Sequence, residues 1–310
     1  MSTAPYTVIL THDVDRLSFR GLPFAGREQA ALLKDMVWGN ATRTLRGRIT
    51  PGDFLRSAAA ALALPFTLAG LAPDLLENTF ARITALEAEY GARSTFFFVP
   101  FARRAGHTPQ GRPASAHRAV HYRLSDWAGL VRALVAQGWD VGVHAIDAHT
   151  DPRAADEERA ALARIVGPRY PLGARVHWLY ETPALNRNLA QAGYAYNATP
   201  GWNDSVGFPG GRYQPYTDAA TGLPIVPLNI QDTTLLREDR MGLGPKAAWN
   251  AIERLLEEAR RRRGVISVLW HNDSFVPPRA WDRLYRRLLE RARADGAALL
   301  SVAQALKAAN

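Results

Sequence analysis

The sequence predicts an α/β fold, an irregular (β/α) barrel of seven or eight strands with a helical segment inserted after the first strand. Three observations favour it. Short apolar runs alternate with helix-like stretches along most of the 310 residues. Several of these runs are rich in Val, Ile and Leu, which is typical of the buried strands of a parallel sheet. Histidines and aspartates stand where four of the runs end.

The first predicted strand begins at Tyr6 and ends abruptly in one histidine and two carboxylates, within Thr11-His12-Asp13-Val14-Asp15. A basic, helix-like segment follows, up to about residue 73. Its apolar part, residues 58–68, is too short and too interrupted by Pro65 to span a bilayer. We expect it to form a buried helix of an insertion, with a surface that touches a membrane as the alternative.

From residue 78 the alternation becomes regular. The predicted helices and strands are helices at 80–90, 125–137, 156–166, 183–192, 245–263 and 279–295, strands at 94–100, 139–144, 174–179, 194–196, 223–230, 265–271 and 297–302, and a short terminal helix. A Gly- and Pro-rich loop covers residues 200–222. We therefore expect one domain over residues 1–310, with the insertion at about residues 16–75.

Composition restricts the possible partners and ligands. The chain has no cysteine, so disulfides and thiolate metal sites are excluded. Its formal net charge of +9 favours anionic partners. No nucleic-acid-binding signature accompanies the arginines, and the run at residues 260–263 fits the last turn of a helix, so we expect no nucleic-acid partner. The N-terminus lacks a basic segment followed by an apolar one, which predicts a cytoplasmic protein.

Polar residues at the strand ends predict one site. Asp13 and Asp15 follow the first strand, His144 ends another, Asp232 follows a third and His271 ends a fourth. In a barrel these ends meet at one face. Two aspartates so close together repel each other, and a metal ion on one, with the other left as a base, would stabilise both. The alternative is a pair of aspartates that cap the loop.

Five sequence motifs together resemble the NodB-type polysaccharide deacetylases, carbohydrate esterase family 4. In chain order they are Asp13-Val14-Asp15, the strand Thr95-Phe96-Phe97-Phe98-Val99, Gly142-Val143-His144 followed by His149, Arg175 placed nineteen residues before the Tyr194 of an Ala-Gly-Tyr, and Val268-Leu269-Trp270-His271. The resemblance extends from Thr7 to Val302 without the insertion.

The resemblance implies that Asp15, His144 and His149 bind a divalent metal, zinc first. Asp13 would be the general base, with Arg175 orienting it and His271 as the general acid. The chemistry agrees, because one carboxylate and two imidazoles leave zinc an open position, and a histidine can protonate a leaving amine. The implied reaction removes an acyl group, expected to be acetyl, from an amino sugar or a glycan-carrier substrate.

Two departures from the family pattern leave alternatives open. The paired histidines of the family are four residues apart, whereas His144 and His149 are five apart, so Asp147 competes as the third ligand. His177 stands where the family has proline two residues after the arginine. It would then bind substrate or be a packed strand histidine. His12 should point away from Asp13, because side chains alternate along a strand.

Other residues are candidates for substrate binding. Trp202, in the loop 200–222, could form part of a sugar-binding wall, and Asp232 could bind substrate or orient His271. The arginines of the insertion would lie beside the active face and recruit an anionic glycan carrier or membrane surface. Two other functions stay open: hydrolysis of cyclic imides or ureides on the same fold, and a catalytically silent glycan-binding protein.

Overall fold

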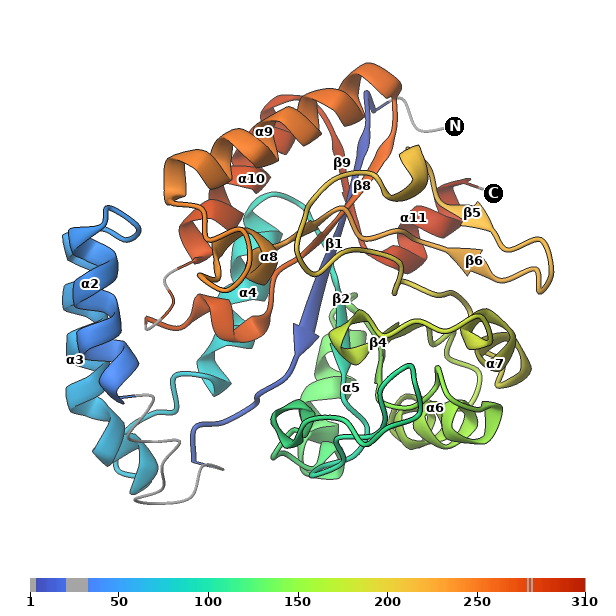
Figure 1. The fold of residues 1–310 in the computed structure, drawn as a ribbon, viewed down its shortest axis with the longest axis horizontal. Coiled ribbons are helices and arrows are strands. Elements are labelled where there is room, and N and C mark those ends of the chain that lie inside the picture. Colours follow the sequence, from blue (N-terminus) through green and yellow to red (C-terminus); the bar gives the residue numbers. More distant parts are fainter. Residues whose placement is uncertain (1–3, 21–32, 278, 280, 310) are drawn as a thin grey trace.

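The computed structural model describes residues 4–20, 33–277, 279 and 281–309. A curled, parallel, seven-stranded sheet forms its centre (Figure 1). The hydrogen-bonded order is β4-β3-β2-β1-β8-β7, with β9 also pairing with β1. The bounds of these strands are β1 Thr7–Val14, β2 Thr95–Phe98, β3 Asp140–Ala145, β4 Ala174–Val176, β7 Ile230–Gln231, β8 Val265–Leu269 and β9 Ala298–Leu300. The predicted α/β, barrel-like fold is confirmed.

Strand β1 is the centre of the sheet. Its first half pairs with β9 and its second half with β2, and β8 pairs with it from Thr7 to Thr11. All these pairings are parallel, so the strands end on the same side. The residues of β1 after Thr7 are all buried, which explains the apolar run Val8-Ile9-Leu10 in its first half.

Helices cover the sheet (Figure 1). Their bounds are α4 Glu77–Glu89, α5 Ala128–Ala136, α6 Pro152–Val166, α7 Leu185–Gln191, α9 Pro245–Arg262, α10 Asp282–Ala294 and α11 Val302–Ala309. Helix α6 begins earlier than predicted because Asp151 caps it, accepting hydrogen bonds from the backbone N–H groups of Arg153 and Ala154. Helix α9 carries Arg260–Arg262 in its last turn, as predicted, and Arg263 follows in the left-handed conformation.

Several predicted strands are shorter in the structure, and two differ more strongly from the prediction. Residues 194–196 form no strand, and the neighbouring Asn197 makes isolated bridges to Ala174 and Ile225. Residues 223–230 separate into β6 (Pro224–Ile225), which pairs with β5 (Tyr216–Thr217), and the beginning of β7. These interruptions make the barrel irregular.

The segment after β1 contains a π-helical turn η1 (Asp35–Gly39) and the helices α2 (Asn40–Leu45) and α3 (Pro51–Leu68). Thr50 and Asp53 form a capping box at the start of α3. Leu64 packs in a small core with Phe19, Leu76 and Val276. The predicted buried helix is therefore present, but only one side of it is buried.

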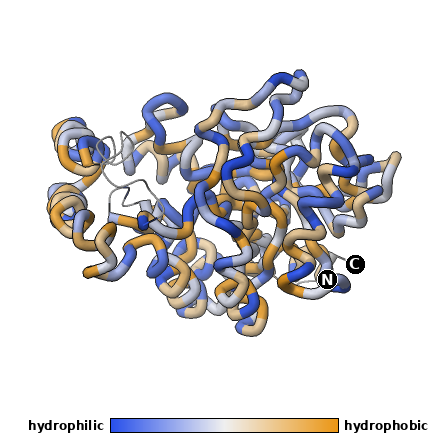
Figure 2. Tube along the Cα trace, turned by 90° about the horizontal axis from the view of Figure 1, so that it is seen from below, coloured by the Kyte–Doolittle hydropathy of each residue, from blue (hydrophilic) through white to orange (hydrophobic). Residues whose placement is uncertain are grey.

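The other side of this segment exposes hydrophobic side chains. Seven of the nine large exposed hydrophobic residues in the described part of the chain lie here: Val37, Trp38, Leu45, Leu55, Leu62, Phe66 and Leu71. Figure 2 shows these helices at the left, apart from the body of the sheet. Among the described residues, no helix combines the length and hydrophobicity needed to cross a membrane.

A buried polar network lies behind β1, away from the candidate site. His12 bonds through Nδ1 to the carbonyl of Trp270 at 2.6 Å and through Nε2 to Glu87 at 2.8 Å. The Glu87 carboxylate also accepts hydrogen bonds from Trp139 and Tyr285. His12 thus faces away from Asp13, as predicted. The network fixes the ends of β1 and β8, which carry the candidate site.

Candidate active site and metal centre

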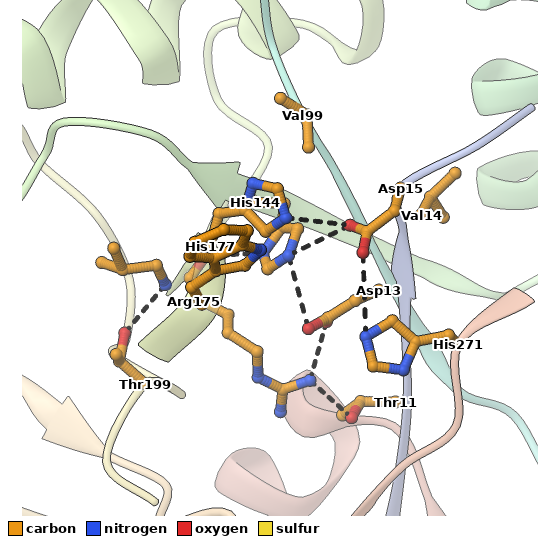
Figure 3. A network of polar contacts seen from close by, with 12 residues as sticks. Thr11, Asp13, Val14, Asp15, Val99, His144, Arg175, His177, Thr199 and His271 are labelled. Carbon is orange, nitrogen blue, oxygen red and sulfur yellow. Dashed lines mark hydrogen bonds and ion pairs between the residues drawn. The ribbon is translucent and has the colours of Figure 1, made fainter. Parts of the chain in front are cut away.

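The carboxyl ends of the parallel strands surround a cleft of about 330 Å³. Its lining includes Asp13, Asp15, His144, His177 and His271. Figure 3 shows these side chains pointing toward one another from different strands. The predicted convergence of strand ends therefore exists in the structure, with His177 as an additional member.

Asp13 is buried and held by Arg175. The Arg175 guanidinium donates through Nη1 to Asp13 Oδ1 at 2.9 Å and to Thr11 Oγ1 at 2.8 Å. Its Nε donates to the carbonyl of Ala198, and its planar group lies over the Phe97 ring. Arg175 is itself fully buried, so the Asp13 carboxylate balances its charge. Asp13 Oδ2 is left facing His144 Nε2 at 3.5 Å.

One carboxylate and two histidines each offer an atom that could bind a metal ion, and these three atoms all lie within 4.8 Å of one another. The residues are Asp15, His144 and His177. Asp15 Oδ1 is 3.5 Å from Nε2 of both histidines. A tetrahedral ion with ligands at about 2.1 Å separates its ligand atoms by about 3.4 Å. The two measured distances fit such an ion.

The chemistry of these atoms also fits a metal. His144 Nδ1 donates to the carbonyl of Arg175 at 2.9 Å, which leaves the Nε2 lone pair directed to the site. Burial, assisted by nearby His177, lowers the pKa of His144 to about 4, so the ring is neutral at pH 7. Asp15 Oδ1 is buried and makes no hydrogen bond within the described part of the chain. Burial raises the pKa of Asp15, but the neighbouring His177 and the protonated His271 outweigh it and hold this pKa below its usual value, so the carboxyl is ionised.

His149 is not in this group, which corrects the predicted ligand set. The chain turns after β3, where Thr150 N–H donates to the Asp147 carbonyl at 2.8 Å. His149 consequently lies against the Tyr180 ring, with 5.6 Å between centroids. Asp147, the competing candidate, accepts a hydrogen bond from the His107 backbone N–H at 2.7 Å and lies near Arg104. Among the described residues, neither side chain is part of the group formed by Asp15, His144 and His177.

His177, and not His149, joins Asp15 and His144 in this group. It follows β4 and lies two residues after Arg175, so alternation along an extended chain brings both side chains to the same face. That spacing was visible in the sequence. The backbone then turns through left-handed residues, Trp178 (φ 63°) and Leu179 (φ 53°), a change that the sequence does not reveal.

His271 follows β8 and is tightly held by Asp232, the first residue of α8 (Asp232–Leu236). Asp232 accepts hydrogen bonds from His271 Nδ1 and from its backbone N–H, both at 2.7 Å, and from Ser274 Oγ at 2.5 Å. His271 Nε2 points into the site, 3.9 Å from Asp15 Oδ2. Of the two roles predicted for Asp232, the contacts match orientation of His271.

Asp232 also sets the protonation of His271. Burial by itself lowers the pKa of His271, but the carboxylates of Asp232, Asp15 and Asp13 outweigh it and raise the pKa to about 10. A general acid must carry its proton at the start of each turnover. The raised pKa keeps His271 protonated at neutral pH.

Replacing Asp232 with asparagine should lower the pKa of His271, since a carboxylate this close shifts a pKa by about 1 to 3 units. The alkaline limb of the pH–rate profile should then move to lower pH by about that amount. Asp239→Asn, at a cleft carboxylate paired with Arg237, is the matched control and should leave the limb in place. An unshifted limb in Asp232→Asn would contradict this role.

The aromatic wall of the cleft differs from the predicted one. Trp178, about two-fifths exposed, lines the cleft together with Asn203, whose side chain donates to the Trp178 carbonyl at 2.8 Å. Trp202 is similarly exposed, but within the described residues it is not part of the cleft lining. Among the described residues, Trp178 is the tryptophan that lines this cleft.

No protein-family model and no curated protein matches the chain. Among solved structures, it is similar to a protein from Mycobacterium smegmatis assigned as a polysaccharide deacetylase, with 16% identity and a TM-score of 0.56, covering 99% of this chain and 91% of that one. The chain has the polysaccharide deacetylase fold. The catalytic domain of a peptidoglycan N-acetylglucosamine deacetylase from Eubacterium rectale is more distant, with 10% identity, a TM-score of 0.44 and coverage of 97% and 90%.

The deacetylase fold does not by itself determine the reaction. A GH57 branching enzyme from Thermococcus kodakaraensis is similar to this chain with a TM-score of 0.50 and 10% identity, covering 98% of this chain and 71% of the enzyme. The function must therefore be argued from the side chains in the cleft.

Proposed function

We propose that the protein is a metal-dependent deacetylase that hydrolyses an N-acyl group, expected to be N-acetyl, on an amino sugar or polysaccharide precursor. One observation carries the proposal. A carboxylate–histidine–histidine group shares a single cleft with a second carboxylate held by a buried arginine and with a histidine held by a buried aspartate. This arrangement supplies a metal site, a base and an acid.

Asp15, His144 and His177 would hold the divalent ion, and zinc suits one carboxylate and two neutral imidazoles. When bound, such an ion supplies Lewis-acid chemistry that polarises an acyl oxygen and makes water easier to deprotonate. The absence of cysteine agrees with this donor set.

Asp13 and His271 would move the protons. Asp13 Oδ2, left without a hydrogen bond from Arg175, takes a proton from the attacking water as its oxygen bonds to the acyl carbon. Arg175 keeps the carboxylate in position through Oδ1. His271 Nε2 gives its proton to the amide nitrogen as the C–N bond breaks, because an amine leaves poorly unless it is protonated. The products are a carboxylic acid and a free amine on the sugar.

The division of labour between the two aspartates is testable. Asp15→Ala should lose the metal, whereas Asp13→Asn should keep the metal and lose most activity, about 100-fold or more. Elemental analysis and turnover of an N-acetylated amino-sugar oligomer, measured on the same preparations, check both expectations. Equal metal loss in the two variants would show that the roles are assigned wrongly. Hydrolysis of a cyclic imide but not of the acetylated sugar would favour the alternative of a cyclic imide or ureide hydrolase. Glycan binding by a protein that holds no metal would favour the alternative of a catalytically silent glycan-binding protein.

Binding of the insertion to an anionic glycan carrier or membrane surface stays a prediction. The cytoplasmic location also stays a prediction. Leu55, Leu62 and Phe66 are exposed on α3, and the exposed arginines of this segment include Arg46 and Arg56. The triple variant Leu55→Ser, Leu62→Ser, Phe66→Ser should bind anionic vesicles more weakly than wild type, and added salt should weaken wild-type binding. Sedimentation with anionic and with neutral vesicles measures this. Absence of wild-type binding at low salt would contradict it.

A further inference from the structure

The cleft that holds the candidate metal group is also lined by three arginines, Arg237, Arg240 and Arg279. Two of them have carboxylate partners. Arg237 donates through Nε and Nη2 to Asp239 at 2.9 and 2.7 Å, and Arg279 donates to Asp273 at 2.8 Å. These two charges are balanced locally.

Arg240 is different. It is half-buried, and its Nη1 donates to the backbone carbonyl of Asn203, a neutral acceptor. No carboxylate of the described residues lies within ion-pair distance of it. Burial and the nearby positive charge of Arg237 lower the pKa of Arg240, and Asp239 and Asp204 offset this only in part. Asp239 is therefore bonded to Arg237, whereas Arg240 is held only by a neutral acceptor.

Further arginines lie toward the insertion. Arg237 and Arg279 also line an adjoining cleft of about 360 Å³, together with Arg43 and Arg48. There Glu238 lies 3.7 to 3.9 Å from the guanidinium groups of Arg43, Arg46 and Arg48. Arg43 also pairs with Asp35 at 2.7 Å, so the arginines that line this adjoining cleft have carboxylate partners, unlike Arg240. A bound divalent ion and the protonated His271 would add further positive charge to the active cleft.

We propose that Arg240, assisted by Arg237, binds an anionic group on the substrate, a phosphate or a carboxylate. A planar guanidinium donates two parallel hydrogen bonds to either oxyanion, and an anion between these two arginines would relieve their mutual repulsion. The substrate would then be an N-acylated amino sugar that carries an acidic group beside the reacting amide. This inference rests on the proposed function for the nature of the sugar, but the anion site itself needs no turnover.

The test compares binding of three sugars that differ in charge: glucose, glucose 1-phosphate and glucuronate. Titration calorimetry on the zinc-loaded full chain should give tighter binding of at least one acidic sugar than of glucose. Arg240→Gln should weaken binding of that acidic sugar about 10- to 100-fold, the range for a hydrogen bond to a charged group, and leave glucose unaffected. A preference for glucose 1-phosphate or for glucuronate identifies the anion as phosphate or carboxylate.

Arg261→Gln, at an exposed arginine near the end of α9, is the matched control and should bind all three sugars as wild type does. Thermal melting checks that both variants are folded. Equal binding of the three sugars by wild type, or equal binding of the acidic sugar by wild type and Arg240→Gln, would overturn the proposal. A protein that binds the acidic sugar through Arg240 but hydrolyses no acylated sugar would instead contradict the proposed function alone.

Discussion

Replacing His271 with alanine should reduce turnover of an N-acetylated amino sugar by about 100- to 10,000-fold, the usual value of a positioned general acid. Zinc content should be unchanged, because His271 is not one of the three residues of the candidate metal group. An ester with a good leaving group should lose much less activity, because such a group departs without a proton.

The structure gives reasons for this expectation. His271 is buried, and Asp232 fixes both its ring and its backbone, so its Nε2 has a defined direction into the cleft. The ring lies beside Asp15, close enough for a bound substrate to reach both the metal group and the acid. A weakly positioned histidine would not give this selectivity between amide and ester.

Turnover of the amide and of the activated ester, measured in parallel with metal content, decides the matter. His117→Ala, which changes an exposed histidine outside the cleft, serves as the control and should behave as wild type. Equal losses on amide and ester would remove His271 from the proton-transfer step.

The second large effect is expected at the third metal ligand. His177→Gln should weaken zinc binding by more than the roughly 10- to 100-fold typical of losing a residue that only orients a ligand. His149→Gln should bind zinc as wild type does, because His149 packs against Tyr180 away from the ligand group. The two substitutions are chemically identical and both positions are buried, so each controls for the other.

Competition with a chromophoric chelator gives the zinc affinity of each variant. Circular dichroism shows whether each variant is folded without metal. Zinc loss in His149→Gln with retention in His177→Gln would return the ligand to the position expected from the sequence. Comparable losses in both would mean that the loop after β3 rearranges when the ion binds.

The fold was predictable wherever a strand is long and buried. Strands β1 and β8 stand out in the sequence because each contains an uninterrupted or nearly uninterrupted apolar run, Val8-Ile9-Leu10 in β1 and Val265 to Leu269 in β8, that is buried in the sheet. The prediction failed at residues 194–196 and 223–230, where equally apolar residues make only short pairings or isolated bridges. An apolar run shows that a segment is buried, and whether its backbone pairs depends on neighbours distant in the sequence.

The site was predictable to the same extent and for a similar reason. The sequence places four residues of the site at the ends of predicted strands, and the carboxyl ends of parallel strands meet at one face. These residues are Asp13, Asp15, His144 and His271. His149 lies in a loop, where spacing from His144 carries little information about direction, because one turn of the backbone redirects the side chain. His177 could have been preferred from its two-residue spacing after Arg175. Orientation of His271 was one of two roles predicted for Asp232, and the tertiary contacts were needed to choose between them.

The central position of β1 has a consequence for how the protein is made. Its partners β8 and β9 lie more than 250 residues later in the chain, at Val265 and Ala298 opposite Thr7. Such distant pairing makes folding slow, because a long loop must close before any contact is gained. During synthesis Asp13 and Asp15 emerge first, but they wait for His271 until β8 has left the ribosome. The proposed general acid would therefore join the site only once the sheet has closed around its first strand, whereas the last residue of the candidate metal group, His177, is synthesised well before β8.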